Sequence, residues 1–116
     1  MKGVLLGLML AALPLGAAAE RYSLPAQFWL SARTGAAVAA EPALAQAVQR
    51  FLSRDPRGAA LFIHHARGDE SLAQAEELRG WLIALGVEAS RISLTETRAV
   101  ASAADRNLTI EVIENK

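Results

Sequence analysis

The chain has 116 residues, of which 12 are Lys or Arg and 12 are Asp or Glu, so its formal net charge is zero. It has no Cys, 53% of its residues are hydrophobic and only 5% are aromatic. The length allows one domain at most. The balanced charge argues against a nucleic-acid partner, which is held mainly by clustered Lys and Arg. The absence of Cys excludes a disulfide scaffold, a thiolate zinc site and a cysteine nucleophile.

Residues 1–19 have the pattern of a secretory signal peptide. Lys2 precedes an almost unbroken apolar run over residues 4–15, and three Ala residues end the segment. We expect cleavage before Glu20, which leaves a single domain over residues 20–116 without a membrane-spanning segment. A retained membrane anchor is the alternative, because the apolar segment is only slightly shorter than the roughly 20 residues of a transmembrane helix. Arg outnumbers Lys and Ala is abundant, which favours the periplasm of a Gram-negative bacterium with a GC-rich genome.

The first part of the mature chain is predicted to contain a strand and a helix. Phe28, Leu30 and Ala32 alternate with other residues, the period-two signal of a short strand that ends near Gly35. Pro42 follows an acidic residue and is well placed as the first residue of a helix. Four apolar residues then share one stripe, which predicts an amphipathic helix lying on a sheet: Leu44, Val48, Phe51 and Leu52.

The middle of the chain is predicted to hold a buried strand and a second helix. Residues 55–58 have turn chemistry, because Pro fixes φ and Gly tolerates unusual backbone angles. Residues 59–66 form an apolar run that is typical of a buried strand. Residues 69–71 offer helix N-cap candidates. Apolar residues then repeat at helical spacing up to Gly86, which predicts the end of the helix: Leu72, Ala75, Leu78, Leu82 and Leu85.

Two further strands are predicted near the C-terminus. They cover residues 91–94 and 108–113, and the polar, Ala-rich loop of residues 97–107 joins them into a hairpin-like end. The order of elements is then β-α-β-α-β-β. Right-handed crossovers place both helices on one face of the sheet, so the expected fold is an α+β two-layer sandwich.

This order of segments resembles the OmpA-like peptidoglycan-binding domain, and the likeness covers nearly all of the mature chain. It is carried by residues 28–32, by the Ala- and Leu-rich helix that ends in Asp55-Pro56, and by residues 61–65, 71–87, 91–92 and 110–112. Residues 98–102 also look like the family's Arg-Pro-Val-Ala-Ser loop. The resemblance implies an OmpA-like fold and a non-enzymatic cell-envelope module near the outer membrane. It also implies that the partner is a peptidoglycan peptide or an envelope protein and that no cofactor is needed.

The resemblance also names candidate ligand residues. In the family, a carboxylate after the second strand and an Arg on the next helix grip a diaminopimelate-type residue of the wall peptide. At the matching positions this chain keeps His65 but has Arg67 in place of the acid and Gln74 in place of the Arg. Asp69 is either a replacement ligand for the ammonium group or a helix N-cap. The implied member is therefore degenerate, with candidate ligand residues His65, Arg67, Asp69 and Gln74.

Other conspicuous side chains carry less functional information. His64 and His65 are adjacent, so on a strand they point to opposite faces, and we expect no metal site. Trp29 and Trp81 suit a sugar-stacking platform or, equally, a core or partner-facing role. No spacing of Ser, His and acid indicates a catalytic site, so we expect no enzyme activity. The competing hypothesis is a protein-interaction accessory of a secretion or motility assembly, which uses a sheet edge or an apolar patch.

Overall fold

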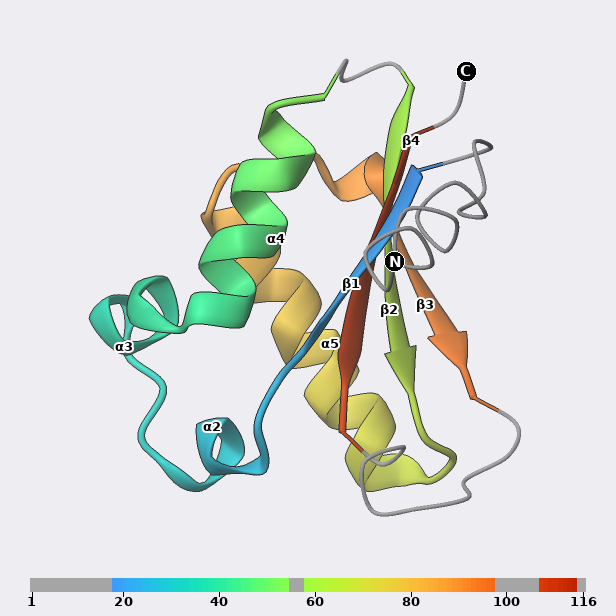
Figure 1. Cartoon of the computed structure of the whole chain (residues 1–116). Helices are drawn as coiled ribbons and strands as arrows, with labels where there is room; N and C mark the ends of the chain where they lie inside the picture. The colour runs from blue at the N-terminus through green and yellow to red at the C-terminus, as the bar shows by residue number, and fades with distance from the viewer. Residues whose placement is uncertain (1–17, 55–57, 98–106, 115–116) are drawn as a thin grey trace, which may run out of the picture.

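The computed structural model of the chain describes residues 18–54, 58–97 and 107–114. Four strands form one mixed sheet in the order β1-β4-β2-β3, and helices α4 and α5 both lie on one side of it (Figure 1). The strands are β1 (Ala18–Ser23), β2 (Ala59–His65), β3 (Ile92–Glu96) and β4 (Thr109–Glu114). The helices are α2 (Ala26–Leu30), α3 (Gly35–Ala40), α4 (Pro42–Leu52) and α5 (Asp69–Ala84), and the 3₁₀ turn η1 covers Ala89–Arg91. The expected two-layer α+β arrangement is confirmed.

Strand β4 lies inside the sheet, between β1 and β2, and is antiparallel to both. Strand β3 pairs with β2 in parallel and is the strand at the far edge. The predicted hairpin-like end is therefore wrong, because β3 and β4 are not neighbours. In this position β4 buries Ile110 and Val112 beneath the helices and finds backbone partners on both sides.

The segment around Phe28 is helix α2, so the strand predicted there is wrong. Pro25 precedes α2, and its carbonyl accepts a hydrogen bond from the N–H of Phe28 at 3.0 Å. Phe28 is buried whereas Leu30 is 84% exposed, so the two side chains do not share one buried face. An alternation this short does not separate a strand from a helical turn. Trp29 therefore lies on a helix and not on a strand.

The first strand is β1, in a segment to which the sequence assigned no element. Its register places Tyr22 opposite Ile110 and Arg21 opposite Glu111. Because neighbouring strand residues point to opposite faces, Tyr22 faces the helices and Arg21 faces the open side of the sheet. The expected cleavage point before Glu20 falls within this strand, and the residues after it pair with β4 up to Ser23↔Thr109.

Helix α4 begins as predicted, with Pro42 as its first residue. The carboxylate of Glu41 accepts a hydrogen bond from the N–H of Ala43 at 3.2 Å and so caps the helix. The buried stripe consists of Leu44, Ala47, Val48 and Phe51. Leu52 was expected in this stripe but is 55% exposed. It follows Phe51 by about 100° around the helix axis, which takes it beyond the edge of the contact with the sheet.

Helix α5 begins at Asp69, and Gly68 occupies the N-cap position without a side-chain cap. The N-cap role expected of Asp69 is therefore wrong. Gly68 has a φ of 113°, a backbone conformation that Gly adopts more readily than other residues. Asp69 instead contributes a negative charge to the first helical turn, where the helix dipole favours it.

The C-terminal end of α5 confirms the predicted stop. Gly86 has a φ of 113°, and its N–H donates to the carbonyl of Ile83 at 3.0 Å. The N–H of Val87 donates to the carbonyl of Leu82 at the same distance. Together these bonds make a Schellman motif. The buried residues of α5 are Ala75, Leu78 and Leu82, whereas Leu72 is exposed.

The core lies between α4, α5 and the inner face of the sheet. Each fully buried aliphatic side chain contributes about 1.5–3 kcal/mol of hydrophobic stabilisation. The largest buried side chains include Leu24, Leu44, Leu61, Ile63, Leu78, Leu82, Leu108 and Ile110. None of the helices in the described part of the chain has the length and apolar character that crossing a membrane requires.

Some sequence predictions fall on residues that the structure does not describe. These are the apolar segment of the expected signal peptide (residues 1–17), most of the turn at residues 55–58, and residues 98–106. The last range contains the residues that look like the Arg-Pro-Val-Ala-Ser loop.

Candidate functional site

The expected ligand residues lie around the end of β2 and the first turns of α5. His65 is the last residue of β2 and only 6% exposed, with its side chain on the buried face of the sheet. Its Nδ1 donates a hydrogen bond to the carbonyl of Ala66 at 2.9 Å, and its own carbonyl accepts from the N–H of Thr97 at 2.7 Å. His65 thus ends the strand and fixes the start of the following loop.

Arg67 lies on the surface between β2 and α5. Its Nε is 3.1 Å from Oε2 of Glu96, at the end of β3, and the two side chains are 76% and 51% exposed. Such an exposed pair contributes at most about 1 kcal/mol. The guanidinium is therefore open to solvent and only loosely held.

Asp69 and Gln74 do not point to a common place. Asp69 is exposed at the start of α5, and Gln74 is half-buried. Five residues correspond to about 500° of helical rotation, so the two side chains leave the helix about 140° apart. Within the described residues, no hydrogen bond or ion pair joins any two of His65, Arg67, Asp69 and Gln74. The structure brings the four residues to one end of the molecule but forms no clasp from them.

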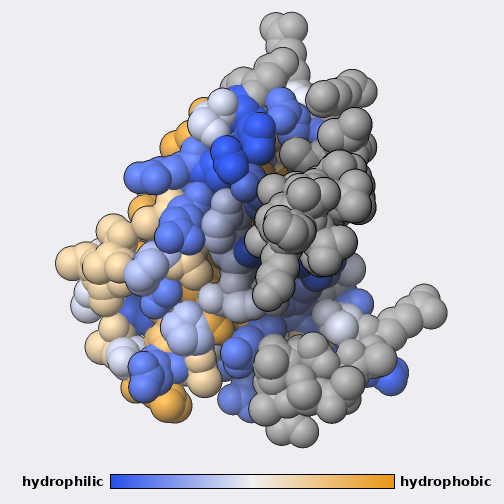
Figure 2. All heavy atoms as spheres, in the orientation of Figure 1, coloured by the Kyte–Doolittle hydropathy of each residue, from blue (hydrophilic) through white to orange (hydrophobic). Residues whose placement is uncertain are grey.

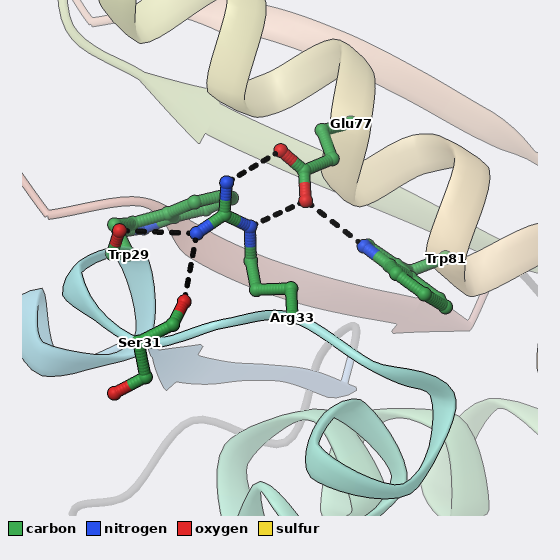
Figure 3. Close-up of polar contacts among 5 residues, drawn as sticks. All are labelled: Trp29, Ser31, Arg33, Glu77 and Trp81. Carbon is green, nitrogen blue, oxygen red and sulfur yellow. Dashed lines mark hydrogen bonds and ion pairs between the residues drawn. The ribbon is translucent and has the colours of Figure 1, made fainter.

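The most connected polar cluster lies elsewhere, between the segment after α2 and the outer side of α5 (Figure 3). Arg33 binds Glu77 with two bonds, from Nε to Oε2 at 2.5 Å and from Nη2 to Oε1 at 3.1 Å. Its Nη1 donates to the carbonyls of Trp29 at 3.0 Å and Ser31 at 3.2 Å. Trp81 donates from Nε1 to Oε2 of Glu77 at 3.0 Å. We call these five residues the Arg33 cluster.

The electrostatics of the Arg33 cluster match its geometry. The hydrogen bond from Arg33 lowers the pKa of the Glu77 carboxyl, against a smaller opposing effect of burial. The same bond raises the pKa of Arg33. The guanidinium also lies over the ring of Trp29, 5.1 Å from its centroid, which adds a cation–π contact. Because these protein groups occupy the guanidinium, the cluster fastens the α2 segment to α5 and leaves little of Arg33 for a ligand.

This geometry also decides between the two interpretations of the tryptophans. Trp29 and Trp81 are half-buried and pack against the core, and Phe28 meets Trp29 edge-on with a centroid separation of 4.9 Å. A sugar platform needs an open ring face, and Arg33 covers one face of Trp29. The structure therefore favours the packing role over the stacking platform.

A second charged group joins β1 to the end of α4. Glu20 binds Arg50 through both carboxylate oxygens, and it binds Arg54 at 3.3 Å. Arg54 also reaches Glu114 of β4 at 2.9 Å, while its buried Nε has no hydrogen-bond partner among the described residues. The hydrogen bond from Arg50 lowers the pKa of Glu20. Beside this group is an open cavity of about 360 Å³, lined by Tyr22, Gln46, Gln49, Arg50 and Ser53.

The open face of the sheet carries a smaller polar group. Nε2 of His64 and Oε1 of Glu111 lie 2.7 Å apart, and Arg21 approaches the same oxygen to 3.5 Å. His64 and His65 thus face opposite sides of the sheet, as predicted. In the described ranges, no three His, Asp or Glu side chains come together as metal ligands would.

No protein-family model matches the chain, and no curated protein matches its sequence. The likeness to OmpA-like domains therefore rests on the sequence segments quoted above. The function has to be argued from those segments and from the geometry of the described residues.

Sequence reasoning missed both charged groups. Glu77 and Trp81 are separated by four residues on one helix, a spacing at which side chains interact, and this was the one available signal for the Arg33 cluster. Arg33 lies 44 residues before Glu77, and no local pattern links the two. Glu20 and Arg50 are similarly 30 residues apart.

Proposed function

We propose that the chain is an exported, non-enzymatic module of the OmpA-like type that associates with peptidoglycan or with an envelope complex in the periplasm. The observation that carries the proposal is the arrangement of the elements. Helices α4 and α5 lie on one face of a four-stranded sheet (Figure 1), and β1, α4, β2, α5, β3 and β4 follow one another as β-α-β-α-β-β, with the short helices α2 and α3 inserted before α4. The apolar N-terminal segment, with its small residues before Glu20, supports export.

The residues at the start of α5 support a modified form of this association. A zwitterionic ligand requires an acceptor for its ammonium group and a donor for its carboxylate. Asp69 is an exposed acceptor, and Arg67 is an exposed donor that is only loosely paired with Glu96. Gln74 has replaced the guanidinium that the family provides on this helix. The proposed contact with the wall peptide is therefore weaker than that of an ordinary family member.

The direct test is sedimentation with isolated peptidoglycan sacculi. We expect part of the protein to pellet, and we expect Gln74→Arg, which restores the family's residue type, to increase the pelleted fraction. Asp69→Asn should lower it, whereas Glu76→Gln removes a charge at an exposed position of the same helix and should not. If the protein stays in the supernatant while an ordinary OmpA-like domain pellets, wall binding is excluded.

Export has a separate test in the N-terminal sequence of the protein recovered from fractionated cells. Cleavage before Glu20 predicts a periplasmic species that starts with Glu-Arg-Tyr. A membrane-bound species that keeps Met1 would support the retained anchor. A cytoplasmic species with the complete N-terminus would contradict export.

A second candidate function is a protein-interaction accessory, which the exposed apolar surface favours. Leu30 projects from α2 with 84% of its surface exposed. Nearby, α3 consists of Gly, Val and Ala, with all four Ala side chains exposed. Figure 2 shows the resulting hydrophobic surface over α3, at the left of the molecule. Co-purification from envelope extract should yield a stoichiometric partner that is lost with Leu30→Ser but kept with the matched change Leu72→Ser, at an exposed leucine of α5. Absence of any such partner counts against this function.

A further inference from the structure

Strand β1 is one edge of the sheet, because its described partner is β4 alone. The N–H of Leu24 donates to the carbonyl of Leu108 at 2.9 Å, directly after the last β1 pair, Ser23↔Thr109. Hydrogen-bonded and non-hydrogen-bonded pairs alternate along an antiparallel ladder. The backbone N–H and C=O of Ser23, and of Arg21 two residues earlier, therefore point away from β4 to the free edge.

A groove runs beside this edge, between β1 and α4. It is the cavity of about 360 Å³ to which β1 contributes Tyr22, α4 contributes Gln46, Gln49 and Arg50, and Ser53 adds the C-cap of α4. These four residues of the helix and its cap fall at i, i+3, i+4 and i+7, so they lie on one side of α4. The free edge thus has a wall of polar side chains along one side.

The groove has hydrogen-bonding capacity with little net charge. Glu20 neutralises Arg50 by binding it with both carboxylate oxygens. Within the described residues, the side-chain amides of Gln46 and Gln49 form no hydrogen bond, and the hydroxyl of Ser53 donates to the carbonyl of Arg50 at 2.8 Å, which leaves its oxygen free to accept. Neutral polar side chains of a ligand suit such a surface.

We propose that the free edge of β1 and this groove bind an extended segment of another protein, which adds to the sheet as a further strand. Backbone groups at alternate residues along a sheet edge are matched by another extended backbone. The side chains of the added strand alternate between the two faces of the sheet. Those on the helix side meet the groove and are neutral and polar. The side chain next to Arg21, on the open side, is a carboxylate.

Charge complementarity favours a different protein over a second copy. Arg21 is 61% exposed and lies 3.5 Å from Glu111, so its guanidinium can take a further acid. A second copy of β1 brings its own Arg21 to that face, and like charges on neighbouring strands are destabilising. The proposal rests on the protein-interaction function and specifies a surface for it that is separate from Leu30.

The test uses the full chain, immobilised, with a displayed library of short unstructured peptides as the probe. Enriched peptides should share one acidic residue flanked by Gln, Asn, Ser or Thr. In the complex, a synthetic copy of an enriched peptide should slow hydrogen exchange at the amides of Arg21 and Ser23. Absence of enrichment over the bare support, or unchanged exchange at both amides, would overturn the proposal.

Two variants at Ser23 separate the backbone from the side chain. Ser23→Pro removes the outward N–H, while Ser23→Ala keeps it; both lose the 3.4 Å contact between the hydroxyls of Ser23 and Thr109. Proline is tolerated on an edge strand where the N–H faces outward. We expect Ser23→Pro to weaken peptide binding about tenfold, the effect of losing one hydrogen bond of about 1.5 kcal/mol. Ser23→Ala should bind like the unmodified chain, and equal binding by the two variants would contradict the proposal.

The variant Arg21→Glu gives a test that leaves the backbone unchanged, so it decides the question if Ser23→Pro does not fold. It should convert the enriched peptides from acidic to basic, and an unchanged preference would overturn the proposal. A dimer of the unmodified chain that Ser23→Pro dissociates would also overturn it, because the edge would then belong to a second copy. Co-purification lost with Leu30→Ser is independent of these outcomes, so the interaction function can survive the failure of this edge.

Discussion

The Arg33 cluster and the start of α5 contain the same kinds of charge but use them differently. In the cluster, the guanidinium of Arg33 donates hydrogen bonds to both carboxylate oxygens of Glu77 and to two backbone carbonyls. At the start of α5, Arg67 has only an exposed pair with Glu96, and Asp69 projects into solvent. Arg33 therefore stabilises the fold, because its hydrogen bonds are all made within the protein. Arg67 and Asp69, at the expected ligand site, are exposed and only weakly bound to other protein groups.

The largest loss of stability is expected from a change in the packing beneath α5. The effects of the charged residues on α5 can be compared with this loss. Leu82 is fully buried, so Leu82→Ala should lower the free energy of unfolding by about 2–5 kcal/mol through lost burial and a cavity. Denaturant unfolding measures this loss. The exposed Ile83→Ala is the control and should cost much less. Equal losses for the two variants would show that α5 does not pack as described.

Breaking the Arg33 cluster should have an intermediate effect. Glu77→Gln keeps the shape of the side chain but replaces the charged acceptor of Arg33 and Trp81, which should cost about 1–2 kcal/mol of unfolding free energy. This range is at the lower end for bonds to charged groups, because the Glu77 side chain is 36% exposed and water screens the pair. Glu76→Gln, at the neighbouring exposed position, should change stability by less than about 0.5 kcal/mol. A loss no greater than that of the control would mean that the cluster does not stabilise the fold.

The cluster should also make stability depend on acidity. Arg33 holds the pKa of Glu77 below its ordinary value of 4.5 in the folded chain, so this carboxyl stabilises the fold fully above that value. The contribution is lost as the pH falls through the lower, folded pKa, because protonation removes the charge that Arg33 binds. We expect Glu77→Gln to flatten the acidic limb of a plot of unfolding free energy against pH. Glu20→Gln should flatten it as well, since Arg50 lowers the pKa of Glu20. Parallel acidic limbs for Glu77→Gln and the unmodified chain would contradict the assignment.

The smallest effect is expected at the start of α5. Asp69→Asn removes a negative charge from the first helical turn, where the helix dipole favours it by about 0.3–1 kcal/mol. Because Asp69 is exposed to solvent, the expected loss is at the lower end of this range. Thermal unfolding at low and high salt measures it, and the difference should shrink as salt screens the charge. A loss larger than that of Glu77→Gln would reverse the contrast between the two regions.

The parts of the fold that sequence reasoning predicted are those with strong local signals. Residues 59–66 were a largely apolar run, Pro42 marked a helix start, and Gly86 marked a helix end. Strand β2 and helices α4 and α5 occur where these signals predict them. The strand prediction for the segment around Phe28 was wrong because the alternation there is short. The conformation of this segment depends on a contact between Arg33 and Glu77, which are far apart in the sequence. The predicted hairpin of the last two strands was also wrong, because β4 pairs with β1 and β2 through contacts between residues far apart in the chain.

The candidate site was less predictable than the fold. The family resemblance selected His65, Arg67, Asp69 and Gln74, which lie at the end of β2, in the loop that follows it and in the first turns of α5. It did not predict that His65 is buried and bonded to Ala66. Nor did it predict that the groove beside β1 combines Tyr22 with residues from α4. Side chains brought together from separate elements leave no spacing in the sequence that would reveal them.

The position of β4 inside the sheet has a consequence for when the protein acquires its structure. Strand β1 has no described neighbour in the sheet except β4, which comes at residues 109–114. During synthesis from the N-terminus, β1 therefore emerges long before the strand with which it pairs, and it joins the sheet only once β4 is available. The described sheet is thus completed by a contact between its two strands that lie farthest apart in the sequence, after β2, α5 and β3 have already been synthesised.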